Sequence, residues 1–170
     1  MMLKFREVIA TALPSEEGVR TRLAGLQTHD WTEVASRFGA LLPEFDGVVA
    51  LPAAQQLAQS LARARGLPAL HTARSISTGH WTLLDTGDAS GEVVIVTEQL
   101  TDGLAELEIM LLCAEKGMNV ISVLAAVERT NAAGRIRLEL HNVTVLSAVQ
   151  LADTPVGLVF ERRTPQSMAR

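Results

Sequence analysis

Cysteine and aromatic residues are scarce in this chain. There is one cysteine and no tyrosine among its 170 residues, and aromatic side chains make up only 4%. A single cysteine cannot form an internal disulfide or a structural zinc cluster, so we expect a reduced, cytoplasmic setting. That cysteine, Cys113, lies among apolar neighbours and is predicted to be buried. The few aromatic side chains exclude a stacking platform for single-stranded nucleic acid.

Charge and hydropathy exclude further classes. The net charge of −4 offers no positive surface for nucleic acid or for anionic lipid. No apolar run approaches the ~18 residues of a membrane span. Residues 1–10 carry charges where a signal peptide would be apolar. Because 48% of the residues are hydrophobic, we predict one soluble globular domain over residues 1–170, with no nucleic-acid and no membrane partner.

Familiar site motifs are missing as well. There is no G-x-S-x-G elbow, no P-loop lysine after a glycine-rich run and no G-x-G-x-x-G after an apolar run. The four histidines, at positions 29, 71, 80 and 141, lack the spacing of a metal site. We therefore predict no metal centre built from protein ligands alone.

The most informative stretch covers residues 91–127. An apolar run at 93–96 precedes a polar turn at 97–102 and a helical pattern with apolar residues at 104, 107, 111 and 114. Gly117 suits a left-handed helix cap, and a second apolar run follows at 120–127. The pattern predicts a βαβ unit with buried parallel strands. Its turn lies where open α/β sheets bind ligands, and the free N–H groups of the helix start favour an anion.

The rest of the chain repeats this alternation. We predict a polar, partly irregular connector after Pro14, and Asp30 as the N-cap of the helix that follows it. Further helices are expected at 3–13, 31–42, 53–65 and 135–140, and further strands at 47–51, 69–72, 143–146 and 156–160. Strands that alternate with helices at this spacing predict an α/β fold with a doubly wound, mostly parallel sheet.

One segment resembles a known family. Residues 93–105, VVIVTEQLTDGLA, resemble the signature of type I phosphoribosyltransferases, in which an apolar strand, two acids and a threonine- and glycine-rich loop open a helix. The segments 47–66, 120–129 and 143–151 are similar to other strands and helices of that family. The resemblance implies a sheet of about five strands within residues 44–153, a small hood from residues 1–43 and 154–170, and a homodimer.

The resemblance also implies a chemistry and its residues. Family members transfer ribose 5-phosphate from phosphoribosyl pyrophosphate to a purine or pyrimidine base, with magnesium. Here Glu98 would be the catalytic carboxylate, and a magnesium ion would be held by the ligand and Glu98 together. The ligand-binding positions would be Thr97 beside it, the phosphate loop Thr101, Asp102, Gly103, Leu104 and Ala105, the pyrophosphate loop with Ala53 and Ala54, and the basic residue Arg74.

The sequence departs from the family pattern at these same positions. Thr97 replaces one of the two acids, Asp102 brings a negative charge to the phosphate loop, and Ala105 lacks a hydroxyl. Alanine replaces the glycines that let a backbone approach pyrophosphate. Asp102 is also a good cap for the helix that follows, accepting N–H groups that a phosphate would otherwise take.

Three hypotheses therefore stand. The chain is an active phosphoribosyltransferase that uses phosphoribosyl pyrophosphate or a related nucleotide-like ligand, or a catalytically silent binding or regulatory protein on the same scaffold. The third is an unrelated α/β domain with a coincidental loop, which the order of strands in the sheet would reveal.

Overall fold

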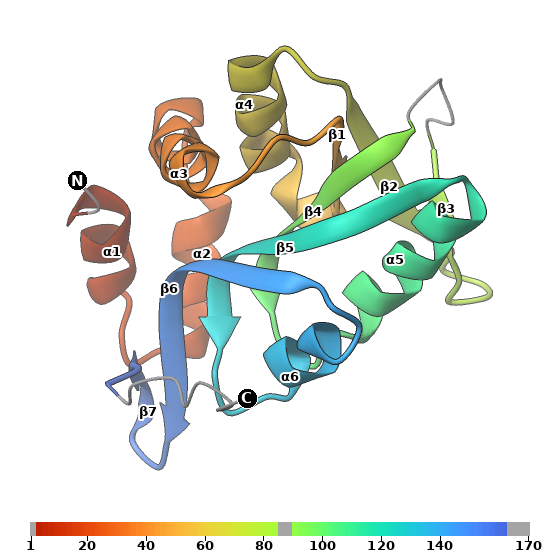
Figure 1. The fold of residues 1–170 in the computed structure, drawn as a ribbon. Helices are drawn as coiled ribbons and strands as arrows, with labels where there is room; N and C mark the ends of the chain where they lie inside the picture. The colour runs from red at the N-terminus through yellow and green to blue at the C-terminus, as the bar shows by residue number, and fades with distance from the viewer. Residues whose placement is uncertain (1–2, 85–89, 163–170) are drawn as a thin grey trace, which may run out of the picture.

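A seven-stranded sheet with the order β3-β2-β1-β4-β5-β6-β7 forms the centre of the molecule (Figure 1). The computed structural model describes residues 3–84 and 90–162. The strands are β1 (Gly47–Ala50), β2 (Ala69–Arg74), β3 (Trp81–Leu83), β4 (Gly91–Leu100), β5 (Met118–Arg129), β6 (Thr144–Thr154) and β7 (Gly157–Phe160). The helices are α1 (Leu3–Ala10), α2 (Glu16–Ala24), α3 (Thr28–Leu41), α4 (Gln55–Arg65), α5 (Leu104–Glu115) and α6 (Gly134–Glu139), with a 3-10 turn η1 (Pro52–Ala54) before α4.

The predicted parallel sheet is confirmed. Strands β2, β1, β4, β5 and β6 run parallel to one another and correspond to the five-stranded sheet expected. The count rises to seven because β3 and β7 add an antiparallel strand at each edge. Alternate side chains of β4 enter opposite faces, with Val94 and Val96 on one and Val93 and Ile95 on the other. Helices cover both faces, which explains why the buried runs of the central strands are apolar without alternation.

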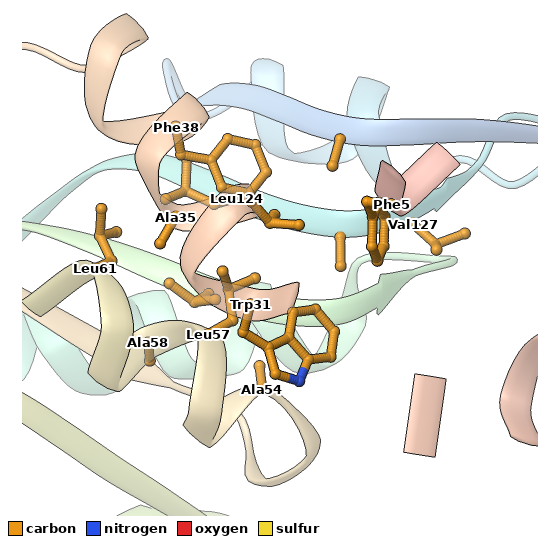
Figure 2. Packing of buried hydrophobic residues seen from close by; sticks show 14 of the residues in the cluster. Phe5, Trp31, Ala35, Phe38, Ala54, Leu57, Ala58, Leu61, Leu124 and Val127 are labelled. Atoms are coloured by element: carbon orange, nitrogen blue, oxygen red, sulfur yellow. The ribbon is translucent and has the colours of Figure 1, made fainter. Parts of the chain in front are cut away.

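One face of the sheet is covered by the helices α1 to α4. Figure 2 shows Trp31, Phe38 and Leu57 packed beside Leu124 of β5. Helix α4 is capped by Gly66, whose backbone is left-handed with φ of 64°. The opposite face is covered by α5 and α6 through Ile109, Cys113 and Leu138, all fully buried.

The predicted connector after Pro14 is wrong, because the segment forms helix α2. Ser15 caps the helix by accepting the N–H of Gly18 at 2.9 Å. Val19 and Leu23 are the buried residues of this helix. Most of its other positions are polar, so the apolar pattern was too sparse to indicate a helix.

Helix α3 begins earlier than predicted. Gln27 occupies the N-cap, and Asp30 lies in the first turn, where its carboxylate accepts the backbone N–H of Gln27 at 3.0 Å. Asp30 is therefore part of a capping box and not the N-cap. Leu41 is 61% exposed at the end of the helix.

The two terminal segments contact one another. Leu158 of β7 donates its N–H to the carbonyl of Pro14 at 2.9 Å, and the Arg6 guanidinium lies 3.7 Å from the centre of the Phe160 ring. The last part of the expected hood, residues 163–170, lies outside the described residues, as do 1–2 and 85–89. Among the helices described, none is both long and apolar enough to cross a membrane.

Candidate functional site

The turn predicted at 97–102 is shorter than expected, because β4 continues through Leu100. Thr97 pairs with Ala125 of β5, Gln99 with Val127 and Leu100 with Glu128. A polar sequence can extend a strand when the neighbouring strand satisfies its backbone groups. Only Thr101, Asp102 and Gly103 separate the strand from α5. The candidate phosphate loop is thus a three-residue turn at the carboxyl edge of the sheet.

Asp102 occupies part of the helix start that a phosphate would need. Its Oδ1 atom accepts the backbone N–H of Leu104 at 3.0 Å. Gly103 is the N-cap residue and has a left-handed backbone with φ of 76°, which an alanine would adopt only with strain. The side chain of Asp102 therefore takes an N–H group at the positive end of the helix dipole, as an anionic ligand would.

A second carboxylate lies at the same helix start. Glu106 is 4% exposed, and its carboxylate interacts with its own backbone N–H and with the Thr97 hydroxyl. Burial raises the pKa of Glu106 and the charge of Asp102 adds to the rise, although these hydrogen bonds partly oppose it. Thr97 is itself only 2% exposed. The hydroxyl at the first acid position therefore faces an internal carboxylate.

Helix α6 holds the loop from its other side. Gly134 donates its N–H to the Thr101 carbonyl at 2.9 Å, and Arg137 donates Nη1–H to the Asp102 carbonyl at 2.5 Å. A Cβ atom on Gly134 would lie 2.4 Å from the Thr101 oxygen. Only glycine allows the two backbones this approach.

A buried ion pair attaches α6 to the sheet. Glu128 is 3% exposed and receives two hydrogen bonds from Arg135, at 2.8 Å from Nε and 2.6 Å from Nη2. Ser147 and Gln150 also donate to this carboxylate. Burial by itself would raise the pKa of Glu128, but these hydrogen bonds and the Arg135 charge hold the pKa below its usual value. The ion pair indirectly supports the candidate phosphate loop, because α6 carries the two groups that bind it.

Glu98, the predicted catalytic carboxylate, lies near the end of β4 and is half-buried. Burial raises the pKa of its carboxyl group. In the part of the chain that the structure describes, no three histidine, cysteine or acidic side chains are grouped closely enough to hold a metal ion. The residues around Glu98 thus do not fit a magnesium site by themselves, and a magnesium ion would need ligand oxygens in addition to Glu98.

The other predicted positions are distributed around this edge. Ala53 is exposed and Ala54 is buried in η1. Leu51, two residues before Ala53, donates its N–H to the Val96 carbonyl of β4 at 3.0 Å. This bond ties the pyrophosphate-loop equivalent to the strand that carries Glu98. Arg74 is exposed at the end of β2, where its Nε–H binds the Gly79 carbonyl at 2.9 Å. Its guanidinium is folded against the turn that leads to β3.

The last two positions of the candidate phosphate loop differ in exposure. Leu104 is 49% exposed, and Ala105 packs against the buried cluster beneath α5. The absent hydroxyl at position 105 therefore leaves a methyl group in contact with the core.

Sequence reasoning missed Glu106, Gly134 and Arg137. A signal existed for Glu106, which stands three residues after the N-cap, where a glutamate commonly interacts with the helix start. Gly134 and Arg137 lie more than thirty residues after the loop in the sequence. No local sequence pattern indicates that they contact it.

These features define a class of protein. The chain is an α/β protein with a parallel sheet, and a strand, short turn and helix N-terminus stand at the edge where such sheets bind ligands. A coincidental loop on an unrelated fold is excluded by the superpositions on solved structures that follow.

The fold is that of the type I phosphoribosyltransferases. An orotate phosphoribosyltransferase from Aeropyrum pernix superposes with a TM-score of 0.64 and 18% identity, covering 76% of each chain. An adenine phosphoribosyltransferase from Thermoanaerobacter pseudethanolicus gives 0.62 and 17%, covering 73% of this chain and 82% of that one. The UMP synthase of Leishmania donovani gives 0.60 and 20%, with 76% of this chain on 28% of that protein. No family model and no curated protein sequence matches the chain.

Proposed function

We propose that this protein is a catalytically silent binding or regulatory protein on the phosphoribosyltransferase fold. Its ligand would be a nucleotide-like small molecule bound at the edge formed by β1 and β4. The observation that carries the proposal is the hydrogen bond from the Leu104 N–H to the Asp102 carboxylate. A 5-phosphate would have to displace this carboxylate from the amide and then lie beside its negative charge.

The size of this effect follows from Coulomb's law. Two unit charges about 4 Å apart repel by roughly 1 kcal/mol in bulk water and by roughly 4 kcal/mol at the effective dielectric of a protein surface. Each ~1.4 kcal/mol is a factor of ten in affinity, so Asp102 should weaken phosphate binding by about 5-fold to about 1000-fold. The nearby carboxylate of Glu106 acts in the same direction.

The substitutions at the other positions support the same view. Thr97 stands where the family carries one of its two ribose-binding acids, so only one acid remains at the strand end. The threonine is buried and its hydroxyl faces Glu106. Ala53 and Ala54 place methyl groups on the loop where glycines would let pyrophosphate approach. The phosphate, ribose and pyrophosphate contacts are thus all weakened, which should abolish transfer chemistry more completely than the loss of one contact.

One observation favours the alternative, an active phosphoribosyltransferase. Glu98 retains the second acid of the signature at the end of β4 and is half-buried. In an enzyme it would bind ribose hydroxyls, and magnesium carried by the pyrophosphate would complete the charge balance. Nucleotide metabolism in the cytoplasm would be the setting under either proposal.

Calorimetric titration with phosphoribosyl pyrophosphate and magnesium tests the proposal. We expect the natural chain to bind weakly or not at all at millimolar ligand and to release no pyrophosphate when a purine or pyrimidine base is added. The Asp102→Thr variant should bind more tightly by at least about 5-fold, because threonine can also cap the helix without bringing a charge.

Two matched variants sharpen this result. Glu108→Gln removes an acid from the exposed side of α5 and should leave the affinity unchanged. Glu98→Ala should abolish binding only if the alternative holds. Tight binding by the natural chain, pyrophosphate release that depends on Glu98, or no gain in Asp102→Thr would each contradict the silent-protein proposal.

A further inference from the structure

The indole N–H of Trp31 has no hydrogen-bond partner in the part of the chain that the structure describes. Trp31 lies in the first turn of α3 and is only 3% exposed. Its ring packs against Phe5, with the two ring centres 6.0 Å apart. Figure 2 shows the indole nitrogen on the side of the ring nearest Ala54 of η1, which belongs to the same buried cluster. A buried tryptophan N–H usually has a partner, so this donor is left for a ligand beside η1.

Glu98 lies on the same face of the sheet as Trp31. Val94 and Val96 belong to the cluster beneath α1 to α4, and alternate residues of a strand share a face. Thr97, between Val96 and Glu98, faces the α5 side instead. The Glu98 side chain is half-buried and has no hydrogen bond or ion pair with any residue in 3–84 or 90–162. This face of the sheet thus carries a donor from α3 and an acceptor from β4, both without a protein partner.

A third polar group without a partner lies beside η1. The turn contacts both β4 and β2. His71 of β2 pairs with Ala50, the last residue of β1 before this turn. Its Nδ1 atom is buried and has no hydrogen-bond partner among the described residues, which is rare in folded proteins. We call Trp31, His71, Glu98 and the turn Pro52–Ala54 the η1 corner.

The charge at this edge disfavours a phosphorylated ligand. Glu98 near the end of β4 and Asp102 in the turn after it are both carboxylates. Asp102 already accepts the Leu104 N–H at 3.0 Å. The two arginines placed at this edge, Arg74 and Arg137, each donate to a backbone carbonyl. A ligand that brings hydroxyl groups and acceptors but no negative charge can satisfy the η1 corner without repulsion.

We propose that the η1 corner binds an uncharged nucleoside in preference to the corresponding 5′-monophosphate, with the Trp31 N–H donating to an acceptor atom of the ligand. A nucleoside carries both kinds of group that the corner lacks. Its ribose hydroxyls can donate to Glu98, and its ring and carbonyl atoms can accept from Trp31. This inference rests on the function proposed above, because it narrows the nucleotide-like ligand of that proposal to one without a phosphate.

Calorimetric titration of the full chain tests the preference. The probes are adenosine, inosine, cytidine and uridine, each compared with its own 5′-monophosphate. At least one nucleoside should bind more tightly than its monophosphate by about 5-fold or more, since the phosphate would lie beside Asp102. Asp102→Asn keeps a side chain that caps the helix but removes the charge, so it should reduce this preference by about 5-fold or more.

Tryptophan variants test the contact itself. Trp31→Phe keeps a ring in the core but removes the N–H, and should weaken nucleoside binding by about 3- to 10-fold. The matched control is Trp81→Phe, which changes a tryptophan packed with α5 on the opposite face and should leave the affinity unchanged. Because the chain has two tryptophans, this control leaves Trp31 as the only indole, and its emission should change when the nucleoside binds. The emission test remains valid if Trp31→Phe does not fold.

Four results would overturn the proposal. They are monophosphates that bind as tightly as their nucleosides, no nucleoside binding at millimolar concentration, equal weakening by Trp31→Phe and Trp81→Phe, and an unchanged Trp31 emission on binding. Failure of the silent-protein proposal is a separate result, because it is measured as pyrophosphate release from phosphoribosyl pyrophosphate with no nucleoside present.

Discussion

The buried ion pair between Glu128 and Arg135 should make a large contribution to stability. In Glu128→Gln the side chain keeps its size but loses the charge that Arg135 neutralises through bonds of 2.6 and 2.8 Å. Removing one member of a buried pair costs about 3 to 5 kcal/mol. The Arg135 side chain is 27% exposed, so water compensates part of the loss and we expect about 2 to 4 kcal/mol.

Urea denaturation and thermal unfolding measure this loss. For a chain of this length, 1 kcal/mol corresponds to about 2 to 4 °C, so the midpoint of unfolding should fall by about 4 to 16 °C. The matched control is Glu139→Gln, which removes the other carboxylate bound to Arg135. Glu139 lies 3.3 Å from Arg135 and its side chain is 44% exposed, so its removal should cost less than about 0.5 kcal/mol.

The pH dependence of stability independently tests whether ionised Glu128 stabilises the folded chain. The pKa of Glu128 is lower in the folded chain than in the unfolded chain, because the hydrogen bonds from Arg135, Ser147 and Gln150 together outweigh the effect of burial. Its contribution to stability is therefore present above the unfolded pKa and is lost as pH falls through the folded pKa. The difference between the natural chain and Glu128→Gln should be constant near neutral pH and shrink in acid. Equal losses in Glu128→Gln and Glu139→Gln, or a difference that grows in acid, would refute the reasoning.

Three further predictions concern single positions. Gly134→Ala should destabilise the chain by about 2 kcal/mol or more in urea, because its Cβ would lie 2.4 Å from the Thr101 oxygen. Gly39→Ala, within α3, should instead stabilise the chain by about 0.5 to 1 kcal/mol, because the nearest atom to its added Cβ would be Leu61 Cδ1 at 4.0 Å. A loss of stability in this variant would contradict the packing described. Burial raises the pKa of the Cys113 thiol to about 11, so below that pH the thiol stays protonated. An aromatic disulfide reagent at pH 8 should modify Cys113 only as fast as the chain unfolds, and rapid reaction would show that it is accessible.

Much of the fold was predictable because its signals are local. The apolar runs in β1, β4 and β5 are buried on both faces, so they appear in the sequence as continuous apolar segments that predict buried strands. Gly117 after α5 has the left-handed conformation predicted for it, with φ of 80°. The sequence pattern gave the wrong prediction where pairing with a residue far along the chain decided the local structure. Residues 97–100 look like a turn, but pairing with β5 keeps them in the strand.

The face that α5 buries could not be read from the sequence. Leu104, Leu107, Leu111 and Ala114 repeat at helical spacing, yet the residues buried against the sheet are Glu106, Ile109 and Cys113. Because apolar residues surround the helix, two faces fit the same periodicity, and contact with the sheet selects one of them.

The chain by itself determined the order of the five parallel strands, the family that the segment 93–105 resembles and the presence of an acid in the candidate phosphate loop. These depend on residues close together in the sequence. Only the tertiary structure decided that Asp102 binds the Leu104 N–H, that Glu106 faces Thr97 and that Gly134 and Arg137 hold the loop. Such contacts depend on strand register and helix rotation, which set distances of a few ångströms between groups far apart along the chain.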